Sequence, residues 1–68
     1  MSLTVAIEKS ELSKLVESTD QLSTICRDQI SADNQVFIFP LPGRMIELLK
    51  LLKAHKVEYN FRDYVLQG

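Results

Sequence analysis

Residues 36–61, VFIFPLPGRMIELLKLLKAHKVEYNF, decide the fold of this chain. The stretch opens with four consecutive apolar residues, Val36 to Phe39, and such unbroken hydrophobicity is typical of a strand covered on both faces. Pro40 and Pro42 end that strand, because proline has no N–H to donate to a neighbouring strand.

The segment after the prolines predicts a helix over residues 43–55. Four apolar residues share one face of this helix: Met45, Leu48, Leu49 and Leu52. From Val57 to Phe61, apolar and polar residues alternate, which predicts a strand with one covered face. A strand, a helix and a strand with short connections favour a right-handed parallel crossover.

Upstream of this unit, residues 3–8 alternate and predict a short strand. The helical period that follows predicts one amphipathic helix over residues 10–30, with a break into two shorter helices near Ser18 as the alternative. Residues 31–34 have the composition of a turn. Residues 1–68 are therefore expected to form one small α/β domain of order β-α-β-α-β, with a three-stranded sheet and two helices, completed by dimerisation.

The size and composition of the chain exclude several classes of protein. With 68 residues, one cysteine (Cys26) and one histidine (His55), it has neither a disulfide framework nor the ligands of a zinc site, and we expect no cofactor. A net charge of −1 makes nucleic acid an unlikely partner. No apolar run is long enough to span a bilayer, and the start of the chain does not resemble an export signal, so we expect a cytoplasmic protein with no membrane partner.

The apolar surface exceeds what so short a chain can bury, because a domain of about 60 residues buries only ~60% of the surface of its unfolded chain. On the helix over residues 43–55, Ile46 and Leu51 lie on the two flanks of the apolar face. Tyr59, Phe61 and Tyr64 add aromatic surface near the end of the chain. These five residues predict an interaction surface, and the leading hypothesis is a non-enzymatic, regulatory module that homodimerises or binds a protein partner.

Two alternatives remain open. Because helix N-termini attract anions, the loop Pro42-Gly43-Arg44 predicts a small regulatory domain that senses an anion or a nucleotide, with Gly43 and Arg44 at the site. The second alternative is a nucleic-acid-associated regulator. No paired carboxylates or catalytic triad are evident, so we expect no enzymatic activity and no catalytic residues; Cys26 is expected to be a small buried side chain and His55 to favour the C-terminal end of its helix.

Residues 35–66 resemble the opening β-α-β of glutaredoxins and the wider thioredoxin-like fold. The matching features are the apolar strand at 36–39, the leucine-rich helix, and the strand at 57–61. Glutaredoxins carry Cys-Pro-x-Cys or a single active-site cysteine after the first strand, whereas this chain has Pro-Leu-Pro-Gly at 40–43. No functional residue is therefore carried over, and the resemblance implies a redox-inactive half-domain retained for pairing.

Overall fold

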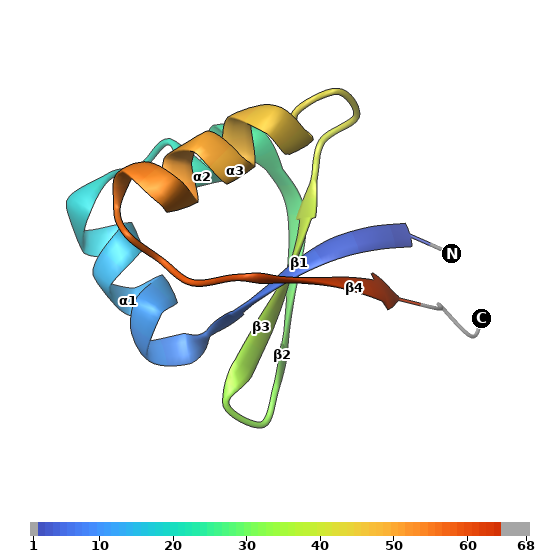
Figure 1. Cartoon of the computed structure of the whole chain (residues 1–68), viewed down its shortest axis with the longest axis horizontal. Helices are drawn as coiled ribbons and strands as arrows, with labels where there is room; N and C mark the ends of the chain where they lie inside the picture. The colour runs from blue at the N-terminus through green and yellow to red at the C-terminus, as the bar shows by residue number, and fades with distance from the viewer. Residues whose placement is uncertain (1, 65–68) are drawn as a thin grey trace.

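The computed structural model describes residues 2–64, which form a small α/β domain of four strands and three helices in this part of the chain. In chain order the elements are β1 (Ser2–Glu8), α1 (Lys9–Ser18), α2 (Leu22–Ile25), β2 (Cys26–Ala32), β3 (Gln35–Pro40), α3 (Met45–Ala54) and β4 (Asn60–Tyr64). The sheet order is β2-β3-β1-β4 and every neighbouring pair is antiparallel (Figure 1).

The predicted three-stranded sheet is therefore wrong, whereas the predicted parallel crossover agrees with the strand directions, because β3 and β4 are both antiparallel to β1 and run parallel to each other. A fourth strand is present, and β3 and β4 do not pair: β1 lies between them and is antiparallel to both. If α1 and α2 together are counted as the first helix, this split pairing matches the β-α-β-β-α-β ferredoxin-like topology, which hosts many unrelated functions. The crossover from β3 through α3 to β4 therefore passes over the position that β1 occupies in the sheet.

The predicted long helix over residues 10–30 is also wrong beyond Ser18, where the alternative break is confirmed. At that point the Thr19 hydroxyl accepts a hydrogen bond from the backbone N–H of Gln21 at 3.1 Å. A single short helix follows, and the chain then enters β2. In β2 a bulge between Cys26 and Asp28 changes which face of the sheet the side chains occupy, and pairing with β3 overrides the apparent helical period.

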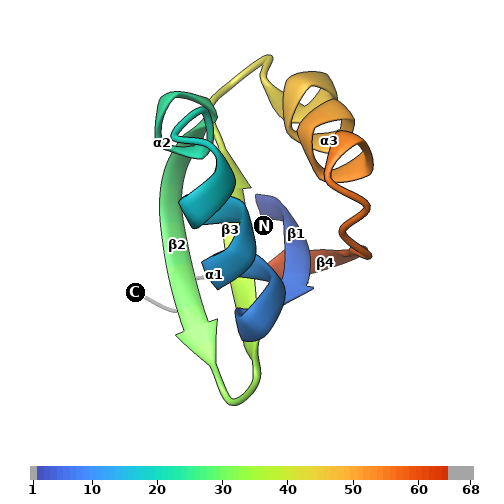
Figure 2. The ribbon, with the colours of Figure 1, turned by 90° about the vertical axis from the view of Figure 1, so that its left-hand side faces the viewer.

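The core lies between the sheet and the helices, all three of which cover the same face of the sheet (Figure 2). Val5 and Ile7 of β1 supply its centre, with Ile38 on the neighbouring strand. The helices and the segment before β4 contribute a further set of buried apolar side chains: Leu15, Leu22, Ile25, Leu48, Leu51, Leu52 and Val57. The predicted helix over residues 43–55 is confirmed as α3, whose buried face (Leu48, Leu51 and Leu52) belongs to this core.

Both ends of α3 are fixed by backbone turns. Before the helix, Arg44 N–H donates to the Leu41 carbonyl at 2.9 Å, with Pro42 and Gly43 between them and a Gly43 φ of +78°. This is the pattern of a type II turn, in which the third residue requires a positive φ. After the helix, Lys56 has a φ of +57°, and Val57 N–H donates to the Leu52 carbonyl at 2.9 Å, as in a Schellman motif.

Candidate interaction surface

Strand β4 forms one edge of the sheet and pairs only with β1 among residues 2–64. Backbone pairing with β1 holds β4 in place, together with the Thr4 hydroxyl of β1, which donates a hydrogen bond to the backbone carbonyl of Arg62 at 2.9 Å. Thr4 is fully buried, so this contact is shielded from water. The opposite edge of β4 faces no other strand of the described chain, and a free edge carries backbone N–H and C=O groups that are open to pairing.

Beside this edge lies an exposed apolar pair. Phe61 of β4 faces Val5 across the ladder and therefore occupies the helix-covered face of the sheet, as does Leu3 two residues before Val5. Yet Phe61 is 49% exposed and Leu3 is 51% exposed. Leu3 lies near the start of β1, an end of the strand that extends past the helices in Figure 1. Phe61 lies on the edge strand, beyond which no other described strand pairs.

The Phe61 ring is oriented by a neighbour in its own chain. Tyr59 lies 5.7 Å away between ring centroids at an interplanar angle of 82°, an edge-to-face contact. Tyr59 itself is half-buried and packs against the core. One side of the Phe61 ring therefore packs on Tyr59, which the core holds in place, and the rest of the ring is exposed. We call Leu3, Phe61 and the outer edge of β4 the edge surface.

The structure separates the five predicted interaction residues. Phe61 belongs to the edge surface, and Tyr59 supports it from the core side. Leu51 is 7% exposed and lies in the core, so it offers no surface to a partner. Ile46, on the first turn of α3, is 68% exposed. The side chain of Tyr64 falls outside the described part of the structure. The sequence did not identify Leu3 as an interaction residue. Its pattern predicts a strand at this position but does not show whether a helix covers the side chain.

The predicted anion site at Gly43 and Arg44 has a specific geometry. Arg44 precedes the first turn of α3, and its guanidinium contacts the Glu47 carboxylate at 2.6 Å. Both side chains are about half exposed. The positive charge of Arg44 is thus already paired with a carboxylate of its own helix, which lowers its attraction for an added anion.

The structure also places Cys26 and His55, the single cysteine and the single histidine of the sequence. Cys26 begins β2 and packs against the core, and burial raises the pKa of its thiol to about 11, so the nucleophilic thiolate is scarce at neutral pH. Its place on a strand corrects the expectation of a helical position, and it is only partly buried. His55 is exposed directly after the last residue of α3, where its N–H donates to the Leu51 carbonyl at 3.2 Å.

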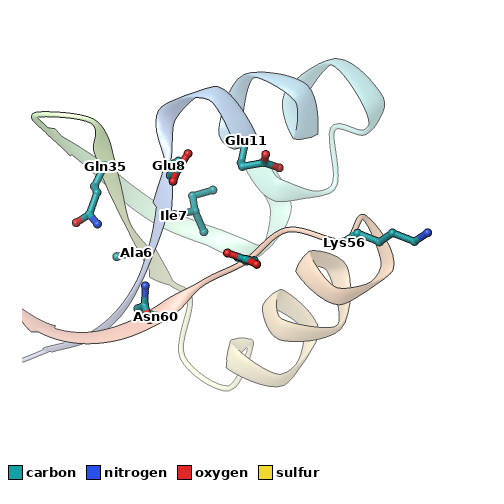
Figure 3. Close-up of a pocket in the computed structure, with 8 residues that line it drawn as sticks. Ala6, Ile7, Glu8, Glu11, Gln35, Lys56 and Asn60 are labelled. Carbon is teal, nitrogen blue, oxygen red and sulfur yellow. The ribbon is translucent and has the colours of Figure 1, made fainter.

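A polar hollow of about 330 Å³ opens where β1 ends (Figure 3). Its polar lining comes from three regions of the chain: Glu8, Glu11, Gln35, Lys56, Glu58 and Asn60. The Lys56 side chain extends away from the other labelled residues in Figure 3, so it does not point at the carboxylates. Among residues 2–64, no three His, Cys, Asp or Glu side chains are grouped so that they would hold a metal ion. The sequence signal for this hollow was weak, because its polar residues come from three regions of the chain, around residues 8–11, 35 and 56–60, that lie far apart in the sequence.

No family, curated protein or solved structure was found to match the chain. Within the described residues, every helix is too short or too polar to cross a membrane.

Proposed function

We propose that this chain is a non-enzymatic interaction module that binds another polypeptide through the edge surface. The observation that carries the proposal is the position of two half-exposed apolar side chains, Leu3 and Phe61, next to an unpaired strand edge. Extended segments bind free edges through backbone hydrogen bonds, while side-chain contacts beside the edge supply specificity. The edge surface offers both kinds of contact.

The two edges of the sheet differ in a way that favours β4. On the other edge strand, β2, a bulge disturbs the ladder and most residues of the strand are exposed and polar. Bulges and polar residues are devices that discourage pairing at an edge. On β4, Arg62 and Asp63 add charge, but Phe61 and the neighbouring Leu3 leave apolar area that the rest of the described chain does not cover.

The small size of the domain supports the same proposal. A chain of this length leaves a large fraction of its surface outside its core, and association is a common source of added stability for such chains. The single cysteine, Cys26, suits a reducing compartment, and the proposal includes a cytoplasmic location. The resemblance of residues 35–66 to glutaredoxins stays a prediction and contributes nothing to this argument.

Photo-crosslinking in cells tests the proposal. A photoreactive aromatic amino acid replaces Phe61 in the chain, and the cells that produce it are irradiated. Val16, which is 56% exposed on α1, provides the matched control position. We expect covalent adducts with a defined polypeptide from position 61 and a background level from position 16, with the adduct identified by mass spectrometry and reproduced with purified components. Equal yields at the two positions would overturn the proposal.

A further inference from the structure

We propose that the polypeptide bound at the edge surface is a second copy of this chain, paired antiparallel to β4 about a two-fold axis at Phe61. This inference rests on the proposed function and names the partner. Its basis is the order of residues in β4, Asn60-Phe61-Arg62-Asp63-Tyr64, and the face of the sheet that each occupies.

Symmetry restricts how two copies of β4 can pair. With a two-fold axis perpendicular to the sheet, one residue faces its own counterpart, and residues equally far from it on either side face each other. Side chains then stay on their own face of the sheet. Three residues in the middle of β4 are available as the central residue: Phe61, Arg62 and Asp63.

Charge selects among these three registers. Centring on Arg62 sets two guanidinium groups directly opposite each other, and centring on Asp63 does the same with two carboxylates. Like charges in directly opposed positions destabilise a strand pair. Only the register centred on Phe61 puts no like charges opposite each other.

The Phe61 register also matches polar groups. On the face of the sheet away from the helices, Asn60 faces Arg62 of the second copy, and an amide oxygen accepts hydrogen bonds that a guanidinium donates. On the helix-covered face, each Asp63 lies beyond the paired phenylalanines, two residues from Phe61, so the two carboxylates do not face each other. The strand is therefore complementary to itself in this one register.

The same register covers the apolar part of the edge surface. Phe61 lies against Phe61 of the second copy, with a Leu3 beside each ring on the adjoining β1 strands. Four side chains that the single chains leave half exposed then form one apolar cluster across the axis. The two sheets join through β4 into one continuous sheet, and neither copy keeps β4 as a free edge.

Pairwise cysteine crosslinking tests the register while retaining Phe61. In a Cys26→Ser background, one preparation carries Asn60→Cys and another carries Arg62→Cys, both at exposed positions. Facing residues of an antiparallel pair have Cα atoms about 4.5–5.5 Å apart, which is within the range that a disulfide spans. After mixing and mild oxidation, we expect the mixed 60–62 disulfide to exceed either homodimer by about tenfold, as resolved by mass.

A matched pair on the exposed face of α1, Ser13→Cys and Glu17→Cys, measures random collision. A dominant 62–62 homodimer would overturn the Phe61 register. If the mixed disulfide and both homodimer disulfides all stay at the collision level, self-pairing through β4 is overturned. Photo-adducts from position 61 with a different polypeptide would then leave the proposed function standing, so the two failures are distinguishable.

Discussion

The Schellman motif that ends α3 leads to a prediction about Lys56. This residue has a φ of +57°, and the N–H groups of Lys56 and Val57 close the helix on the carbonyls of Lys53 and Leu52 at 3.1 and 2.9 Å. A residue with a Cβ in the left-handed conformation costs about 1–2 kcal/mol, whereas glycine adopts it freely. Glycine loses about 0.5–1 kcal/mol through its greater freedom in the unfolded chain.

We therefore expect Lys56→Gly to raise the free energy of unfolding by about 1 kcal/mol relative to Lys56→Ala, the difference between the two terms above. Alanine is the right comparison because it removes the ammonium group, as glycine does, but keeps a Cβ at the same backbone angle. In a domain of this size about 1 kcal/mol corresponds to a Tm increase of roughly 4–8 °C. Urea unfolding followed by circular dichroism, at one fixed protein concentration, measures the difference.

The result that would refute this reasoning is a Lys56→Gly chain that unfolds at the same urea concentration as Lys56→Ala, or at a lower one. Lys53→Gly is the control for position. It lies inside the last turn of α3, where glycine has no left-handed strain to relieve, and we expect a loss of about 1 kcal/mol there.

Three further predictions concern the core, the turn before α3 and the buried thiol. Leu52→Ala, at a fully buried position, should lower the free energy of unfolding by about 2–5 kcal/mol in urea titrations, whereas Ile46→Ala should change it by less than about 0.5 kcal/mol; equal effects would contradict the assigned core. Gly43→Ala should cost about 1 kcal/mol, which is the left-handed strain at its φ of +78° less the unfolded-state freedom that glycine loses, since an added Cβ meets nothing within 4 Å; an unchanged Tm would refute the type II turn. Because burial raises the pKa of the Cys26 thiol from 9.0 to about 11, folding favours its neutral form, so its contribution to stability is complete below pH 9 and is lost as the pH rises to about 11. The free energy of unfolding, measured from pH 7 to 11 for this chain and for Cys26→Ala, isolates that loss. If the free energies of the two chains change with pH in the same way, the prediction is contradicted.

The elements that the sequence predicted well are those whose local pattern allows one interpretation. Strand β1 alternates, β3 is an unbroken apolar run closed by Pro40, and α3 has a dense leucine face. Strand β2 was missed because its state depends on pairing with β3 and on a bulge, neither of which leaves a local signal. Sheet order was missed for the same reason, since it depends on contacts far apart in the chain.

The candidate site was predicted in part, and α3 shows why. Its apolar residues surround the helix, so the helical period alone did not decide which flank faces the core. Packing buries Leu51 and leaves Ile46 exposed. Phe61 was predicted from its type, but its exposure goes with its place on the edge strand β4, and sheet order is a tertiary property.

The central place of β1 has a consequence for how the chain folds during synthesis. Of the four described strands, β1 is synthesised first, and in the finished sheet it is flanked by β3 and β4, which are synthesised later. One side of β1 stays open to other chains until residues 35–40 have been made, and the other side until residues 60–64 have been made. A second copy emerging nearby on the same messenger RNA would meet this strand before its own chain closes over it.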